Sequence, residues 1–243
     1  AAITVLLEKE FGNIYIDKMR AICLLEADFN WLNKLVFARR MMDQAYAEGK
    51  VPFEQFARRR TQAAHGVLCK VLFCDMIRSL HQTAGIESVD LGNCYDAVAH
   101  PIASIALQAF KVPMVMAVLT LSVLQTMTFY LRTGYGLAEE GYGGTKEDPT
   151  FGYGQGNGMA PPGFLTVSAL MTHAYRRLGH GSSFVGAWSG ILFFIAAIIF
   201  VDDSDLLHRA RRRNMSDSDF FDQVQGATYD WGFITQATGG YLK

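Results

Sequence analysis

Two adjacent aspartates are the residues with the clearest chemical potential in this chain of 243 residues. Asp202 and Asp203 follow the apolar run 191–200 and precede a second apolar stretch at 206–208, which predicts a hairpin with both carboxylates at its tip. Neighbouring carboxylates repel each other, and a divalent cation is the simplest partner that offsets the repulsion. Because Mg²⁺ takes one or two carboxylates together with substrate phosphates, the pair predicts a Mg²⁺ site.

A third carboxylate, Asp90, stands near the end of the alternating segment 86–91, which predicts a short strand. If the ends of these strands face each other in one sheet, Asp90 and Asp202 lie close enough to hold two ions about 3.5–4 Å apart. An aromatic residue followed by any residue and two aspartates also arises by chance, and a solvated turn is the structural alternative. The surrounding motifs must therefore decide between a metal site and an ordinary turn.

The elements that position these residues follow from the spacing of apolar side chains. A three-to-four spacing predicts helices, and alternation or short apolar runs predict strands. Pro101 fits a first helical turn, and the glycines and tyrosines of 134–158 predict a loop or hairpin. The range 17–48 is expected to be rich in helix. Further helices are expected at 62–84, 101–113, 114–132, 162–178 and 217–237, and strands at 86–91, 191–200 and 206–208. Few strands, long helices and no regular β-α alternation predict an α+β fold with an antiparallel sheet.

Composition bounds the class of protein. Half of the chain is apolar and 19% is charged, which is ordinary for a globular protein and too hydrophobic for a disordered one. The formal net charge of −1 means that any positive surface for nucleic acid is local. The cysteines have no paired Cys-x-x-Cys spacing, which argues against a zinc site or a disulfide framework and fits a reducing intracellular compartment, nucleus or cytoplasm. They are Cys23, Cys69, Cys74 and Cys94.

Two apolar stretches have to be weighed as membrane spans. The stretch 112–131 has about the length of one, but it contains several hydroxyl and amide side chains and Pro113. The run 191–200 is too short, so no contact with a membrane is expected. The chain has no initiator Met or signal peptide and opens directly in the patterned run 3–7, so we expect a fragment cut at both ends.

Six segments, in the expected order, resemble the reverse transcriptases of the non-LTR retrotransposon and group II intron type. Segment 89–100 resembles the first palm motif, in which an aromatic residue, here Tyr95, follows five positions after an Asp. Segment 154–161, with Gln155-Gly156 and a downstream proline, resembles the second motif, and Phe200-Val201-Asp202-Asp203 resembles the third. Segment 237–243 is similar to the beginning of the fourth, while 18–30 and 55–60 are similar to fingers segments.

The resemblance implies the fingers and palm of a right-hand polymerase, with the thumb missing. Residues 1–84 would be a fingers-like segment and 85–243 a palm-like segment, with a helix and loop insertion at 114–150. The sequence departs from the pattern at Ala57, where the family often has glycine, and at Phe200-Val201, where Tyr-Ala is commoner.

The resemblance also implies a role for each site residue. Asp90, Asp202 and Asp203, with the backbone carbonyl of Leu91, would hold two Mg²⁺ or Mn²⁺ ions. Lys18 and Arg20 would bind the triphosphate, Gln155 and Gly156 would line the nucleotide pocket, and Phe200 would support the primer terminus. Arg58, Arg59, Arg211 and Arg212 would contact template and primer phosphates.

Tyr95 would lie under the sugar of the incoming nucleotide and exclude a 2′-hydroxyl by a steric clash. Each role has a structural alternative: a solvated strand edge for Lys18 and Arg20, a buried aromatic for Tyr95, and solvated faces for the basic runs. A dinucleotide-binding fingerprint at Gly154-x-Gly156 fails, because the third glycine would fall at Met159.

The expected function is that of an RNA-directed DNA polymerase, a nucleotidyltransferase of retroelement origin. Its partners would be an RNA or DNA template with a primer, and deoxynucleoside triphosphates; the oligomeric state stays open. One alternative is an inert or host-repurposed copy that binds nucleic acid without polymerising. The other is an RNA-dependent RNA polymerase, which usually has glycine before the aspartate pair and a small polar residue where Tyr95 stands.

Overall fold

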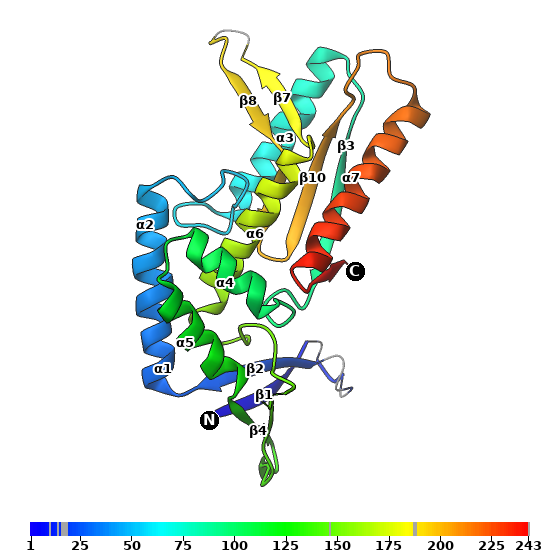
Figure 1. Ribbon diagram of the computed structural model, residues 1–243. Helices are drawn as coiled ribbons and strands as arrows, with labels where there is room; N and C mark the ends of the chain where they lie inside the picture. Colours follow the sequence, from blue (N-terminus) through cyan, green and yellow to red (C-terminus); the bar gives the residue numbers. More distant parts are fainter. Residues whose placement is uncertain (10, 14, 16–18, 146, 187–188, 243) are drawn as a thin grey trace. The chain divides into compact units, whose positions relative to one another are not determined.

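A computed structural model describes residues 1–9, 11–13, 15, 19–145, 147–186 and 189–242 (Figure 1). The chain forms two compact units that interleave along the sequence. Unit 1 consists of Ala1–Lys50 and Tyr95–Val167, and unit 2 of Val51–Cys94 and Ser168–Lys243. The boundary at 84/85 between a fingers-like and a palm-like segment was placed by the sequence motifs and not by compactness. It stays a prediction. Lys18 lies outside the described residues.

The sheet of unit 1 is built on strand β1 (Ala2–Glu8). Strand β2 (Met19–Leu25) pairs with β1 antiparallel, and β4 (Thr128–Thr133) pairs with β1 on the other side in parallel. The two-residue strands β5 (Gly136–Leu137) and β6 (Tyr142–Gly143) pair antiparallel with β4. The loop expected over 134–158 therefore contains two short hairpin strands that extend this sheet.

The helices of unit 1 begin directly after β2. A continuous helical stretch consists of α1 (Ala27–Asn33), the π-helix η2 (Lys34–Met41) and α2 (Met42–Ala47). Later in the chain, α4 (His100–Ala109) has its proline in the first turn, and α5 (Met114–Gln125) begins after Pro113. The Lys111 ammonium, between α4 and α5, pairs with Glu48 at 2.7 Å and ties the end of α2 to the α4–α5 turn.

Two of the ranges expected to be helical also contain a strand, and in both cases strand pairing is the reason. Residues 19–25 of the range 17–48 form β2, because their backbone pairs with β1; Ile22, for example, lies opposite Val5. The helix expected at 114–132 ends at Gln125, since 128–133 pair with β1 and carry the β-branched and aromatic residues that strands favour.

Unit 2 contains an antiparallel sheet in the order β11-β3-β10-β9. It consists of β3 (Ala84–Gly92), β9 (Ala197–Phe200), β10 (Asp203–Arg209) and β11 (Tyr241–Leu242). A separate hairpin pairs β7 (Ser182–Val185) with β8 (Leu192–Ile195). The predicted α+β class with an antiparallel sheet is confirmed.

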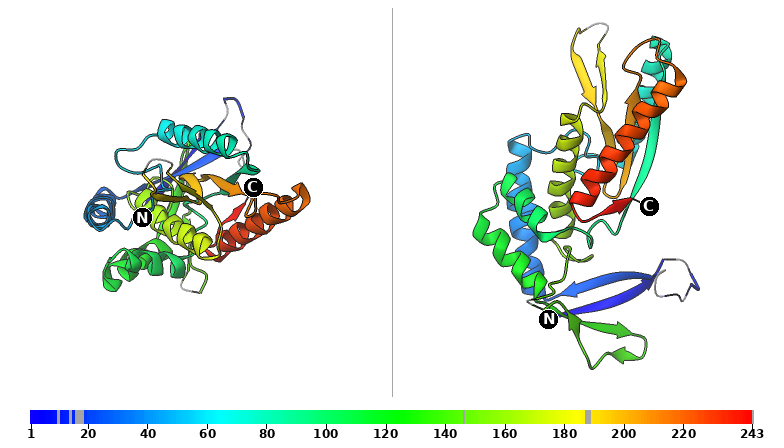
Figure 2. Two further views of the ribbon diagram at one scale, coloured as in Figure 1. Left: turned by 90° about the horizontal axis from the view of Figure 1, so that it is seen from above. Right: turned by 45° about the vertical axis from the view of Figure 1, so that its right-hand side comes forward.

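The helices of unit 2 lie on both faces of this sheet: α3 (Ala63–Leu80) on one, α7 (Asp217–Ala237) and residues 168–177 of α6 (Ala160–Arg177) on the other (Figure 2, left). Helices at 62–84, 162–178 and 217–237 were predicted, and their observed bounds lie within four residues of these ranges. The buried apolar cluster on the α3 side consists of Phe56, Phe73, Ile77, Phe184, Ile195, Ile198 and Leu207.

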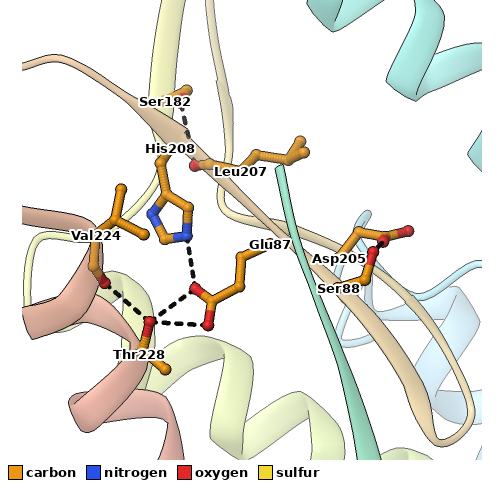
Figure 3. Close-up of polar contacts among 8 residues, drawn as sticks. All are labelled: Glu87, Ser88, Ser182, Asp205, Leu207, His208, Val224 and Thr228. Carbon is orange, nitrogen blue, oxygen red and sulfur yellow. Dashed lines mark hydrogen bonds and ion pairs between the residues drawn. The ribbon is translucent and has the colours of Figure 1, made fainter. Parts of the chain in front are cut away.

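On the other face, a buried polar cluster connects α7 to the sheet (Figure 3). Thr228 of α7 donates to both carboxylate oxygens of Glu87 at 2.8 Å, and His208 of β10 lies 3.1 Å from the same carboxylate. Desolvation raises the pKa of Glu87, but the hydrogen bonds from His208 and Thr228 outweigh it and lower the pKa overall. The rings of Tyr175 and Trp231 meet edge to face at 5.2 Å, joining α6 to α7.

The strand expected at 191–200 is divided into β8 and β9 by a buried ion pair. The Glu54 side chain is fully buried and accepts hydrogen bonds from Arg176 and, at 3.4 Å, from the backbone N–H of Ala196. The Ala196 carbonyl accepts from Leu207 at 3.0 Å. The apolar run by itself contained no signal for this break, because Glu54 is distant in sequence.

The four cysteines, all of which lie in the part of the chain that the structure describes, form no disulfide bond. In the ranges that the structure describes, no helix has both the length and the apolar character that crossing a bilayer requires.

Replacing Glu54 by alanine should lower the free energy of unfolding by about 3–5 kcal/mol, because Arg176 would lose its buried partner. The matched control is Asp75→Ala, which removes an exposed ion pair with Arg78 and should cost less than about 1 kcal/mol. Urea unfolding followed by circular dichroism measures both. Equal losses in the two variants would contradict the structural role of Glu54.

Candidate active site at the β9–β10 turn

The strand register brings the predicted aspartates together. Asp203, the first residue of β10, lies directly opposite Asp90 of β3 and also pairs with Phe200 of β9. Val201 and Asp202 form the two-residue turn between β9 and β10. The Asp202 carbonyl accepts a hydrogen bond from the Leu91 N–H at 3.2 Å, so the turn is attached to β3 beside Asp90.

The turn has an unusual backbone conformation. Val201 has φ of +62°, and a β-branched residue rarely adopts a positive φ. Two-residue hairpin turns need a positive φ at their first central residue, which is why glycine or asparagine usually stands there. The hairpin imposes this conformation on Val201, so the position of Asp202 depends on the pairing of both strands with the rest of the sheet.

The alternation of side chains places the other polar groups on one face. Asp90 and Ser88 of β3 lie opposite Asp203 and Asp205 of β10, and all four share the face on which α3 packs. Ser88 donates to Asp205 at 2.5 Å, as Figure 3 shows beside β10. The Lys70 ammonium of α3 binds the other oxygen of Asp205 at 2.7 Å.

Several negatively charged carboxylates lie close together on this face of the sheet. Partial desolvation raises the pKa of the Asp203 carboxyl, and the negative charges of Asp202, Asp90 and Asp205 raise it further, while Lys70 opposes them. A cavity of about 180 Å³ next to the turn is lined by Phe56, Ala63, Gly66, Val67, Lys70, Ile198, Phe200, Asp203 and Asp205. Phe200, predicted at the primer terminus, is thus at the mouth of the acidic site and is 40% exposed.

The donors present suit a hard cation. Carboxylate oxygens are the ligands that Mg²⁺ prefers, and the raised pKa of Asp203 shows negative charge that a cation would offset. Among the described residues, no group of three or more His, Cys, Asp or Glu side chains is placed to hold a metal ion, so the three aspartates are not a preformed set of three ligands. Mg²⁺ commonly takes only one or two carboxylates from a protein and completes its shell with water and substrate phosphates.

Lys70, Ser88 and Asp205 were not among the predicted site residues. Asp205 had a sequence signal, because it stands two residues after Asp203 and strand side chains alternate with a period of two. Lys70 had no sequence signal that distinguishes it from the other charged residues of a helix. Only the packing of α3 on the sheet brings it to Asp205.

The predicted nucleotide-binding residues for which the structure gives a position lie in unit 1. The Tyr95 ring meets the Phe164 ring edge to face at 5.8 Å. The Gln155 carbonyl accepts from the Cys23 N–H at 2.6 Å, and its own N–H donates to Asp96 at 3.2 Å. Arg20 is an exposed residue of β2, opposite Leu7.

Gly156 is needed for close approach of the backbone. It has φ of +109°, and a Cβ there would lie 2.5 Å from the Cys23 carbonyl oxygen. Asn157 and Gly158 bind Asn33 and Asn30 of α1 through hydrogen bonds of 2.9 and 2.7 Å. The glycine-rich segment is therefore held on β2 and α1, and the Asp96 carboxyl, whose pKa is raised by desolvation, takes part through Gln155.

The predicted phosphate-binding arginines lie at different ends of unit 2. Arg58 and Arg59 belong to the tight turn before α3, where Thr61 donates to the Arg58 carbonyl at 2.7 Å. Arg211 and Arg212 are exposed and follow the C-terminal end of β10. Because the seven residues of β10 span roughly 20 Å, Arg211 and Arg212 are remote from the acidic turn.

Comparison with protein-family models gives no match, and comparison with curated proteins gives none either. Solved structures do match. Telomerase from Candida albicans, solved with the TWJ fragment of telomeric RNA, gives a TM-score of 0.62 at 11% identity, covering 100% of this chain and 40% of that one. Apo telomerase from Candida tropicalis, truncated from its C-terminal domain, gives 0.58 at 12% identity, with 100% and 48% covered.

This chain therefore has a reverse-transcriptase-like fold, since telomerase is a reverse transcriptase. It spans 40% and 48% of the lengths of those two telomerase chains. At such low identity the likeness concerns the fold alone, and it does not single out the retrotransposon or group II intron type.

Asp203→Asn should stabilise the chain at pH 7. The fold disfavours the charged form of Asp203, so the stability associated with its protonated form is present at low pH and lost as pH rises through the raised pKa. Asparagine keeps that neutral state. We expect a gain below about 1 kcal/mol, since the exposed carboxyl is screened by solvent, and a Tm higher by up to about 3 °C.

The gain should vanish below the ordinary aspartate pKa of about 3.9, where wild-type Asp203 is itself protonated. Thermal unfolding between pH 3 and pH 8 measures it. The control is Asp222→Asn, an exposed carboxylate of α7 next to Gln223, which binds the Arg209 carbonyl at the far end of β10. A lower Tm of Asp203→Asn at pH 7 would contradict the repulsion described here.

Proposed function

We propose that this chain is the catalytic part of an RNA-directed DNA polymerase that extends a primer with deoxynucleotides. The observation that carries the proposal is the pairing of Asp203 with Asp90, next to Asp202 in the turn, on a sheet of reverse-transcriptase-like fold. The structural neighbours that were solved with telomeric RNA support a nucleic-acid partner. The retroelement origin rests on the sequence motifs.

In this proposal, Asp90, Asp202 and Asp203 hold two Mg²⁺ or Mn²⁺ ions, with the Leu91 carbonyl as a further oxygen ligand. The chemistry that two such ions supply when bound is activation of the primer 3′-hydroxyl and stabilisation of the pyrophosphate leaving group. The chain contributes position and charge: the β3–β10 pairing sets the spacing of the carboxylates, and Phe200 presents a ring beside them for the primer end.

In the same proposal, recognition of the nucleotide is assigned to residues within the sequence ranges of unit 1. Arg20 and Lys18 would bind the triphosphate, Gln155 and Gly156 would line the pocket, and Tyr95 would exclude a 2′-hydroxyl. The Tyr95–Phe164 contact supports the last role, because a ring held by a neighbour resists displacement by a ribose. Arg58 and Arg59 would contact template or primer phosphates near α3, and Arg211 and Arg212 would contact more distant ones.

A chain that contains residues 1–243 should extend a DNA primer on an RNA template in the presence of Mg²⁺, and Asp202→Asn should reduce the rate at least about 100-fold. The loss follows because the variant lacks one negative charge at the metal site. Asp222→Asn serves as the control and should keep the wild-type rate. Full activity of Asp202→Asn would contradict the metal site, and a folded wild type that binds the duplex without extending it would favour the inert alternative.

Tyr95→Ala should lower the preference for deoxynucleotides over ribonucleotides at least about tenfold, since removal of the ring opens space for a 2′-hydroxyl worth at least about 1.4 kcal/mol of discrimination. Tyr95→Phe keeps the ring and should keep the preference. The measurement is kcat/KM for a matched deoxynucleotide and ribonucleotide pair. An unchanged preference in Tyr95→Ala would reassign Tyr95 to packing and reopen the RNA polymerase alternative.

A further inference from the structure

The ring of Tyr241 covers the backbone of Gly92 at the end of β3. Tyr241 of β11 pairs with Gly92, and Leu242 pairs with Leu91. A Cβ added at Gly92 would overlap the ring carbons of Tyr241 and would lie 2.8 Å from its hydroxyl oxygen. The ring thus occupies the space that any other residue at position 92 would need for its side chain.

This contact places the Tyr241 ring on the same face as the aspartates. Side chains alternate along a strand, so a Cβ at Gly92 would point to the same face as the side chain of Asp90. The Tyr241 ring lies where that Cβ would be. Residues on one face two positions apart lie about 7 Å apart, which is within reach of an aromatic side chain.

The end of α7 brings Tyr241 to this position. Gly239 has φ of +95°, and the Gly240 N–H donates to the Thr235 carbonyl at 3.1 Å, which ends the helix and turns the chain towards β3. The Tyr241 side chain is 47% exposed. It is therefore fixed by the ring contact with Gly92 while part of it remains accessible to a ligand at the acidic face.

Hydrogen-bond donors on this face matter because ionised carboxylates only accept hydrogen bonds. Lys70 is engaged by Asp205 at 2.7 Å, and the Ser88 hydroxyl donates to the same carboxylate at 2.5 Å. A phosphate at Asp90 and Asp203 presents further acceptor oxygens. A phenol hydroxyl on the face that carries Asp90 is a neutral donor for such an oxygen and adds no charge to the site.

We propose that Tyr241 is a further substrate-contact residue, whose hydroxyl donates a hydrogen bond to a phosphate oxygen of the nucleotide bound at Asp90 and Asp203. The ring, seated on Gly92, holds the hydroxyl at the end of β3. This inference rests on the proposed function, since it takes the acidic face as the place where a nucleotide phosphate binds.

Tyr241→Phe tests the hydroxyl without disturbing the ring contact. The variant should raise the KM for the incoming deoxynucleotide about tenfold in primer extension, equivalent to about 1.4 kcal/mol, with kcat within about twofold of wild type. The matched control is Tyr229→Phe, which removes an exposed hydroxyl from α7, where the side chain is 69% exposed. An unchanged KM in Tyr241→Phe would overturn the inference, and a purely structural role of Tyr241 predicts that result.

Gly92→Ala tests the seat of the ring, because the added methyl group requires the Tyr241 ring to move while its hydroxyl is retained. This variant should raise the KM at least as much as Tyr241→Phe, and a normal KM would overturn the role of the ring contact. Combining the two substitutions should add little, since both remove the same hydrogen bond.

Calorimetric titration with inorganic pyrophosphate and Mg²⁺ separates this inference from the proposed function. Tyr241→Phe should bind about tenfold more weakly than wild type and Tyr229→Phe equally well, whether or not the chain extends primers. If the wild type extends primers but Tyr241→Phe matches it in both KM and pyrophosphate binding, the inference fails and the proposed function stands. If pyrophosphate binding depends on Tyr241 in a chain without polymerase activity, the proposed function fails and the phosphate contact stands.

Discussion

The pairing of β3 with β10 places Asp90 and Asp203 directly opposite each other. The organisation of unit 2 depends on this strand pairing. Like charges in facing positions destabilise a sheet, so the pairing must be maintained by the remainder of the two strands. It continues over the whole length of β10, from Asp203 to Arg209 opposite Ala84. Lys70 and Ser88 bind the carboxylate of Asp205, two residues after Asp203 in β10.

The two faces of this sheet have different roles. Towards its C-terminal half, the β10 face that carries the aspartates is covered by α3 through the cluster of Ile198, Leu207 and their neighbours, so only the end near the turn stays accessible. The opposite face is closed by α7 and α6, with the Glu87–His208–Thr228 cluster and the Tyr175–Trp231 contact inside it. The strained backbone of Val201 is maintained because helices pack on both faces of the sheet to which the hairpin belongs. Such a rigid sheet suits a site whose side chains act by holding charges in fixed positions.

Local patterns predicted the helices at α3, α6 and α7 and the strand β3 because each carries apolar residues at the period of its element. They predicted burial less well, since Val67, Leu68 and Val71 of α3 are exposed while Phe73 and Ile77 are buried. These local predictions were wrong where an interaction with a segment distant in the sequence decides the conformation. Residues 19–25 and 128–133 are strands because they pair with β1. The run 191–200 is divided because Glu54, which is paired with Arg176, accepts a hydrogen bond from the Ala196 N–H. Periodicity describes one segment at a time, whereas strand pairing is a property of two segments.

The types and order of the site residues could be read from the sequence alone. Asp90, Asp202 and Asp203 are the acidic residues of the candidate site, and the order of six segments, together with the α+β class, predicted the fold of a reverse transcriptase. The tertiary structure alone decided which other groups join that site. Lys70, Ser88 and Tyr241 reach the aspartate face only because α3 packs on the sheet and β11 returns to β3 after α7. The physical reason is that a hydrogen bond or a ring contact depends on distance in space, and local sequence patterns carry no information on distances between remote segments.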